Sequence, residues 1–311
     1  MILEIAIFAV SLLVLMKSSE LVIDSSIAIS EYSGISQLSI GFILIAISVS
    51  IPDLSVSLAA SLTGKTSMAI GDVLGSSIAN ICLVLGVVTL VRKIHVDRKH
   101  TLDSAELLLL ISIVPAVVLS KSIVGMMEGA VLIVIFILYC LFIVKTRFSI
   151  KIKDGITRSE WRKAIIYFIA GMVLVIASAQ YLVSSASSLA RFLGVSEAVI
   201  GLTLVSFGTT LPELAVDFTA IRRGQAALAI GDIIGSTVVN LTLLLGIILL
   251  VSPLGGVALG VYTVPLAFII IANSFLFYSL VKHEGIGDKQ GLIFILLYII
   301  FIMAAFTMGI A

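Results

Sequence analysis

The chain has 311 residues, of which 60% are hydrophobic and only 12% are charged, and its formal net charge is +1. Soluble domains carry about a quarter charged residues, so this composition excludes a soluble globular protein and predicts an all-α integral membrane protein. The two cysteines, Cys82 and Cys140, both lie in apolar segments, which argues against a disulfide framework or a cysteine metal site. No nucleic-acid partner, obligate protein partner or cofactor is indicated.

Ten apolar segments follow one another along the chain, each long enough to cross a hydrocarbon core of about 30 Å. We therefore predict ten spanning helices, near residues 2–29, 36–62, 66–91, 103–120, 124–145, 162–190, 196–221, 226–251, 256–281 and 289–309.

The distribution of basic residues predicts the orientation of these spans. If the N-terminus is outside, the connectors after the odd-numbered spans are cytoplasmic, and they hold fifteen of the nineteen Lys and Arg residues. Cytoplasmic loops are enriched in Lys and Arg, so a multi-pass protein of the cell membrane with both termini extracellular is expected.

Two blocks of the sequence align without a gap when the chain is shifted by 160 residues. Residues 36–86 match residues 196–246 at nineteen of fifty-one positions, and the identities include polar residues and proline as well as common apolar residues. Chance likeness between two apolar helices would not place Pro, Asp, Ser and Asn in register. We predict a first five-helix repeat at 1–145, a cytoplasmic connector at 146–161 and a second repeat at 162–311.

An odd number of spans in each half would insert the second half upside down. Inverted repeats with interrupted helices at matching positions are typical of secondary transporters, which bind their substrates near the midplane. Proline lacks a backbone N–H and clashes with the preceding turn, so Pro52 and Pro212 are expected to break spans 2 and 7. These breaks would free backbone carbonyls, from Ala46 to Val49 and from Ser206 to Thr209, to bind a cation.

A carboxylate follows each proline directly, Asp53 in the first repeat and Glu213 in the second. An acidic side chain at the bilayer centre costs about 2.5–3.5 kcal/mol on insertion scales and normally has a cationic partner. Spans 2, 3, 7 and 8 contain no Lys or Arg, so the partner is expected to be a transported ion.

Spans 3 and 8 repeat the same polar residues at a spacing of four. This spacing places each set on one helix face, and the sets are Asp72, Ser76 and Asn80 in span 3 and Asp232, Ser236 and Asn240 in span 8. Their oxygen atoms suit hard cations such as Ca²⁺ and Na⁺. Helix packing through small residues explains the neighbouring glycines but not these polar residues.

Two other groups of charged residues have more than one interpretation. Asp217 lies one turn beyond Glu213, either as extra charge in the cavity or its access path, or as a solvated residue at the mouth. Lys17, Glu20 and Asp24 in span 1 are interpreted as a self-contained ion-pair cluster, with a gating role as the alternative.

These motifs resemble those of the Ca²⁺/cation antiporter superfamily, in particular the prokaryotic Na⁺/Ca²⁺ exchangers. The family pattern G-T-S-x-P-E followed by G-N-x-x-G-S is similar to GTTLPEL and GDIIGST here, and more loosely to SVSIPDL and GDVLGSS. The resemblance covers essentially the whole chain. It implies ten helices in two inverted repeats, alternating access by sliding of spans 1 and 6, and no enzymatic activity or cofactor.

By position, the resemblance implies a central Ca²⁺ site between Asp53 and Glu213, with Thr209 and backbone oxygens. Flanking Na⁺ sites are implied at Ser50, Thr210, Ser76 and Ser236, with Asn80 and Asn240 completing the centre. The chain departs from the family pattern in several places: Val49 replaces a threonine, Asp53 replaces a glutamate, Asp72 and Asp232 replace asparagines, and Asp217 is additional.

These departures leave the coupling ion open. A buried carboxylate with like-charged neighbours can bind a proton, so a Ca²⁺/H⁺ exchanger is the alternative to a Na⁺/Ca²⁺ exchanger. A passive cation channel is a further alternative. An intramembrane aspartyl protease is disfavoured, because the repeated motif is Ala-Ile-Gly-Asp rather than G-x-G-D and the sequence has no Tyr-Asp pair. Such an enzyme would also leave the prolines and the repeat unexplained.

Overall fold

The structure is a computed structural model that describes residues 2–95, 98–121, 123–146, 158–192, 206–255, 260–283 and 285–307. Its described part is almost entirely helical. Eight helices are long and apolar enough to cross a membrane, and a bent pair, Gln37–Val49 and Ile51–Leu62, would make nine. Part of the predicted seventh span, residues 196–205, and most of the 146–161 connector lie outside the described residues.

Helices begin and end close to the predicted span limits in both halves. The first half contains α1 (Ile2–Ser33), α2 (Gln37–Ile40), η1 (Gly41–Ile45), α3 (Ala46–Val49), α4 (Ile51–Leu62), α5 (Thr66–Ile78), η2 (Ala79–Val84), α6 (Leu85–Val91), α7 (Arg98–Leu119) and α8 (Met126–Thr146). The second half contains α9 (Arg158–Phe192), α11 (Ser206–Arg222), α12 (Ala226–Val238), η4 (Val239–Leu244), α13 (Leu245–Val251), α14 (Gly260–His283) and α15 (Asp288–Thr307).

The predicted break at Pro52 is confirmed. The helix ends at Val49 and restarts at Ile51, and the two segments meet at an angle of 43°. The prediction for Pro212 is wrong for the described helix, because α11 continues through this residue from Ser206 to Arg222. A proline removes one backbone hydrogen bond, and the turns on both sides of Pro212 retain enough others to keep the helix continuous.

Within the described residues, three segments of π-helix interrupt the α-helices, and the sequence analysis missed them. Two of them, η2 and η4, occupy matching positions in the halves, Ala79–Val84 and Val239–Leu244. Each contains an asparagine of the predicted site, Asn80 or Asn240, as its second residue. A wide π-turn shifts the helix face that follows it, and such turns frequently occur at functional sites.

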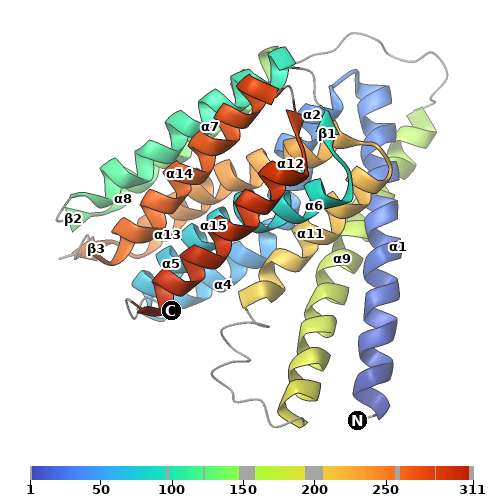
Figure 1. Ribbon diagram of the computed structural model, residues 1–311, viewed down its shortest axis with the longest axis horizontal. Helices are drawn as coiled ribbons and strands as arrows, with labels where there is room; N and C mark the ends of the chain where they lie inside the picture. Colours follow the sequence, from blue (N-terminus) through green and yellow to red (C-terminus); the bar gives the residue numbers. More distant parts are fainter. Residues whose placement is uncertain are drawn as a thin grey trace.

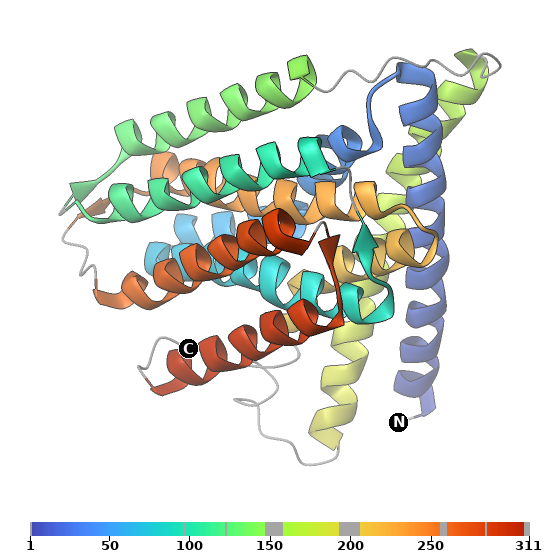
Figure 2. The same ribbon diagram turned by 45° about the horizontal axis from the view of Figure 1, so that its top comes forward.

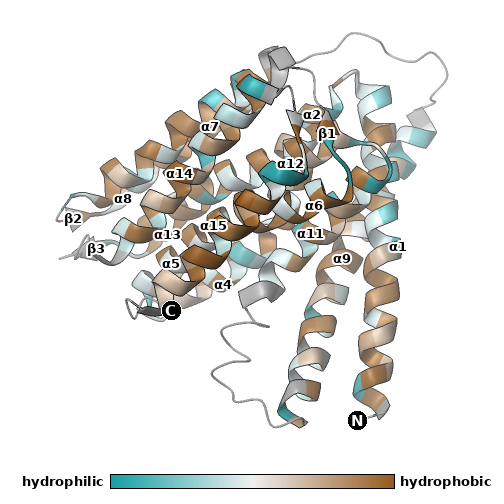
Figure 3. Cartoon of the chain, in the orientation of Figure 1, coloured by the Kyte–Doolittle hydropathy of each residue, from teal (hydrophilic) through white to brown (hydrophobic). Residues whose placement is uncertain are grey.

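Helices α1 and α9 form a pair at one edge of the molecule (Figures 1 and 2). They are equivalent elements of the two halves, they contact one another extensively, and Figure 1 shows that they run in opposite directions. The remaining long helices form a bundle that crosses this pair. The N-terminal part of α1 is strongly hydrophobic, whereas its other end is more polar (Figure 3).

Two short antiparallel strand pairs connect the halves. Strand β1 (Ile94–His95) pairs with β4 (Gly285–Ile286), and β2 (Ile123–Val124) pairs with β3 (Leu254–Gly255). In each pair one strand comes from the first half and one from the second. Helices of the two halves also pack against one another, because α6 contacts α15, α8 contacts α13 and α7 contacts α14. The two halves therefore share one core.

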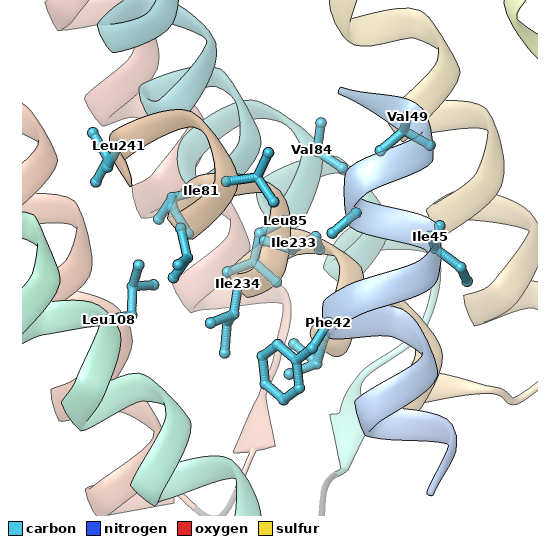
Figure 4. Close-up of a cluster of buried hydrophobic side chains, with 14 of the residues drawn as sticks. Phe42, Ile45, Val49, Ile81, Val84, Leu85, Leu108, Ile233, Ile234 and Leu241 are labelled. Atoms are coloured by element: carbon cyan, nitrogen blue, oxygen red, sulfur yellow. The ribbon is translucent and has the colours of Figure 1, made fainter. Parts of the chain in front are cut away.

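This core includes a close crossing of η1 and α12. Phe42, Ile45 and Val49 lie along one helix beside Ile233 and Ile234 of α12 (Figure 4), and all five are fully buried or nearly so. The crossing requires glycine. A Cβ atom on Gly41 would lie 2.9 Å from the Cα of Gly231, and a Cβ on Gly235 would lie 2.7 Å from the Cα of Phe42. The small residues thus bring the backbone of the second span against the eighth.

Candidate cation-binding site

The first half holds its polar residues on a tight helical hairpin. Helices α4 and α5 contact one another and are joined by a short turn in which Gly64 has a φ of +78°. Two contacts indicate their register, because Ser57 donates to Asp72 at 2.7 Å and the Ser76 hydroxyl lies close enough to the Asp53 carboxylate to interact with it. Side chains four residues apart share a helix face, so these two pairs lie one turn apart on the facing sides of α4 and α5.

The second half repeats this arrangement on α11 and α12, which are joined by a turn at Gly224, with a φ of +75°. Asp217 and Asp232 face one another within hydrogen-bonding reach, and the Ser236 hydroxyl donates to Asp232 Oδ1 at 3.0 Å. The same spacing pairs Glu213 with Ser236. We call each set of two paired positions a polar ladder, made of 53/76 and 57/72 in the first half and 213/236 and 217/232 in the second.

The two polar ladders meet at Asp53 and Glu213. The Thr209 side chain of α11 hydrogen-bonds to the Asp53 carboxylate of the first ladder. Glu213 lies close enough to Asp53 and to Asp232 to experience their charge. The structure thus brings the two carboxylates that follow the prolines together between four helices, as the sequence analysis expected.

The site is closed off from solvent. Asp53 is 1% exposed, Glu213 is 2% exposed, and Asn80 and Asn240 are 1% and 0% exposed. Asp217 is 1% exposed, so its interpretation as a solvated residue at the mouth is wrong. Charged and amide groups rarely lie at this depth without partners, since the loss of hydration is costly.

Many polar atoms of the site have no hydrogen-bond partner among the described residues. These atoms are Ser50 Oγ, Asp53 Oδ1, both polar atoms of Asn80 and Asn240, Glu213 Oε2, both oxygens of Asp217 and Asp232 Oδ2. They make up ten of the fifteen such buried side-chain atoms. A polar group this deeply buried requires compensation, and oxygen atoms gathered without donors provide a place for cations.

One of the backbone oxygens predicted as ligands is also used by the helix. The Ala46 carbonyl accepts a hydrogen bond from Ser50 N at 3.2 Å, which leaves one lone pair of this oxygen for a cation. The donor that Pro52 removes is the one that would reach Ser48, since an α-helical N–H bonds four residues back. Val49 is fully buried and offers no side-chain oxygen.

The remaining predicted residues fall into three groups. Ser76 and Thr210 are buried in the described structure, at 8% and 4% exposure. Ser206 begins α11, and its side chain lies outside the described residues. Asp72 is half-buried, and its Oδ2 is already engaged by Ser57.

The donor chemistry fits hard cations. Within the described residues, no three His, Cys, Asp or Glu side chains are arranged to hold a metal ion. A cation at the centre would instead bind the Asp53 and Glu213 carboxylates together with hydroxyl, amide and carbonyl oxygens. Such mixed oxygen coordination is typical of Ca²⁺ and Na⁺ and unlike the nitrogen and sulfur ligands of transition-metal sites.

A membrane-embedded bundle with buried, unpaired carboxylates defines the class of a membrane cation transporter. A family model described as sodium/calcium exchanger protein matches residues 3–145 and 163–307. The chain belongs to this family, as the resemblance of the motifs indicated.

Relatives of known sequence match most of the chain. An uncharacterized membrane protein of Methanocaldococcus jannaschii, MJ0091, is 31% identical and covers 99% of this chain and 100% of its own length. The inner membrane protein YrbG of Escherichia coli is 32% identical, with 81% of each chain covered. The sodium/calcium exchanger MaX1 of Methanosarcina acetivorans is 26% identical, and the match covers 96% of this chain and 97% of MaX1.

The fold is similar to a solved exchanger. A structure of the sodium-calcium exchanger NCX_Mj, soaked with 10 mM Na⁺ and no Ca²⁺, superposes with a TM-score of 0.86 at 31% identity. The match covers 97% of this chain and 98% of the other.

Proposed function

We propose that the protein is a secondary active antiporter that exchanges Ca²⁺ for Na⁺ across the cell membrane. The observation that carries the proposal is the meeting of Asp53 and Glu213, both buried, with oxygen atoms that no described side chain satisfies. Ca²⁺ would bind between these carboxylates. Na⁺ would bind at the flanking hydroxyls of Ser50, Thr210, Ser76 and Ser236. The names of the relatives MaX1 and NCX_Mj support this choice of ions.

The proposed mechanism is alternating access between two inverted five-helix repeats. Support comes from α1 and α9, equivalent helices of the two halves that pack together and run in opposite directions. This pair would move past the bundle that holds the ions. A site that opens to one side at a time couples the two ions, because only the loaded protein would change its direction of access.

A Ca²⁺/H⁺ exchanger remains the second candidate, favoured by one observation. Five acidic residues, Asp53, Asp72, Glu213, Asp217 and Asp232, lie on the two polar ladders, and four of them are at most 2% exposed. One Ca²⁺ neutralises two of these charges. Protons could take up others, and the proton gradient would then drive transport.

Ion uptake into proteoliposomes separates these candidates. Na⁺-loaded vesicles at equal internal and external pH should take up ⁴⁵Ca²⁺, whereas vesicles with only a pH gradient should not. Glu213→Gln should abolish this uptake. Glu128→Gln, the same chemical change in a carboxylate paired with Lys121 at 2.8 Å on α8, is the matched control and should retain it.

Uptake driven by the pH gradient without Na⁺ would replace the proposal with Ca²⁺/H⁺ exchange. Conductance without dependence on a counter-ion would indicate a channel. Normal uptake by Glu213→Gln would remove the proposed central site.

A further inference from the structure

The two polar ladders differ at their second pair, 57/72 in the first half and 217/232 in the second. In the first half, the Ser57 hydroxyl donates to Asp72, so a carboxylate meets a donor. In the second half, the equivalent positions hold Asp217 and Asp232, and two carboxyl groups face one another. These residues occupy corresponding places in the repeat, yet the second pair carries one more acidic group and one fewer donor.

The Asp217/Asp232 pair has little compensation from the protein. Asp232 Oδ1 accepts from Ser236, but Asp232 Oδ2 and both oxygens of Asp217 have no partner among the described residues. The pair is 1% and 0% exposed, so bulk solvent does not replace the missing partners. Two ionised carboxylates at this depth repel one another and require a positive charge.

The basic residues at the end of α11 do not supply this charge. Arg223 is bound to Asp24 and lies 3.6 Å from Glu20. Arg222 is exposed and lies over the Phe218 ring, at 5.8 Å from its centroid. Helix α12 contains no Lys or Arg. The positive charge must therefore come from outside the chain.

The position of the pair places it beside the central site. Asp217 lies one helical turn past Glu213, and Asp232 lies one turn before Ser236, which corresponds to about 6 Å along each helix axis. This spacing leaves room for a second cation next to the first. The Asp217/Asp232 pair lies on the side of the central site that is nearer to the end of α11 that carries Arg222.

We infer that Asp217 and Asp232, with the Ser236 hydroxyl, form a separate site for a hard cation, adjacent to the central site and present in the second half alone. The donors are oxygens, so the site would take Ca²⁺ or Na⁺. The identity of this cation as a transported ion rests on the proposed function. The first half has no equivalent site, because Ser57 already occupies Asp72. A cation that enters from the Arg222 end of α11 would thus bind at this additional site on its way. A cation that enters past the first half would meet no such site.

Counting bound ions tests this inference without transport. Equilibrium dialysis of the purified protein in detergent with ⁴⁵Ca²⁺ and with ²²Na⁺ gives the number of each ion bound per chain. Asp217→Asn should bind one cation fewer than the unsubstituted protein. Glu213→Gln should lose a cation of its own, and the double variant should show both losses. Glu128→Gln is the control and should bind the full number.

Asp217→Ser provides a second variant, because it recreates the pair found in the first half and supplies a donor to Asp232. It should lose the same cation as Asp217→Asn. An unchanged ion count in both variants would overturn the inference and indicate that the two carboxyls share a proton. A double variant that loses no more than Glu213→Gln would overturn it as well, by assigning Asp217 to the central site. Absence of exchange would count against the proposed function, whereas the ion count decides the additional site.

Discussion

Arg223, just after the end of α11, donates to Asp24 of α1 and so ties the outer helix pair to the helix that carries Glu213. The sequence analysis had grouped Asp24 with Lys17 and Glu20. The structure confirms the contact of Lys17 with Glu20, at 3.0 Å, but gives Asp24 a partner from the other half of the chain. If α1 moves relative to α11, as the proposed mechanism requires, this ion pair must break.

Arg223→Gln should therefore favour the conformation in which α1 has moved away from α11. The side chains of Arg223 and Asp24 are 34% and 59% exposed, and exposed ion pairs contribute about 0.2–1 kcal/mol. The conformational equilibrium should shift by up to about fivefold. A double-mutant cycle with Asp24→Asn, read out as the initial rate of ⁴⁵Ca²⁺ uptake, measures the coupling. Strictly additive effects would show that the pair does not hold the helices together.

Asn240→Ala should weaken Ca²⁺ binding by about tenfold or more. The amide is fully buried and both of its polar atoms lack partners among the described residues, so it is free to bind an ion. Interactions of a polar group with a charge contribute about 1.5–3 kcal/mol. The half-saturating Ca²⁺ concentration in a dialysis experiment measures the change. Asn273→Ala is the comparison, because Asn273 contacts Ser112 away from the ladders, and an equal loss there would contradict a direct role of Asn240.

Gly231→Ala should destabilise the protein by about 1–3 kcal/mol, the usual cost of overpacking. The added Cβ would lie 3.0 Å from the Cα of Gly41 and 3.1 Å from the backbone N of Phe42, neither of which can rotate away. Gly125→Ala is the control, since its Cβ would meet Pro253 at an ordinary 3.6 Å. Thermal unfolding in detergent should show a lower midpoint for Gly231→Ala only. Similar midpoints would mean that the crossing of η1 and α12 adjusts freely.

Val49→Thr should increase the affinity for Na⁺ several-fold. Thr209, its equivalent in the second half, places a hydroxyl against Asp53, whereas Val49 is buried without a polar atom. The substitution preserves shape and adds one hard oxygen ligand. The Na⁺ concentration that half-maximally inhibits ⁴⁵Ca²⁺ binding reports the effect, with Val49→Ala as the control for packing. An unchanged or weaker Na⁺ competition would show that position 49 does not face the ions.

Local rules in the sequence predicted the long helices, whereas the internal repeat and the family resemblance predicted the meeting of Asp53 with Glu213. Hydropathy sets the helices, proline sets the bend at Ser50, and a spacing of four sets the helix faces. The continuity of α11 through Pro212 depends instead on the balance of hydrogen bonds around one missing donor. The π-turns at Asn80 and Asn240 depend on tertiary packing, which no local pattern encodes.

The ion pair between Arg223 and Asp24 could not be predicted from the sequence. Arg223 and Asp24 are 199 positions apart, and nothing near either residue selects the other. The Asp217/Asp232 contact could have been found, because the two positions fall opposite one another once α11 and α12 are read as an antiparallel hairpin. The same reading gives Ser57 and Asp72, which the structure pairs at 2.7 Å.

The crossed strand pairs restrict how the protein can change shape. Strand β1 of the first half is bonded to β4 of the second, and β2 of the first is bonded to β3 of the second. One half therefore cannot rock as a rigid body against the other without parting both strand pairs. In the proposed alternating access, the plane of movement would instead cut through each half, leaving α1 and α9 on one side and the crossed strands, with both polar ladders, on the other.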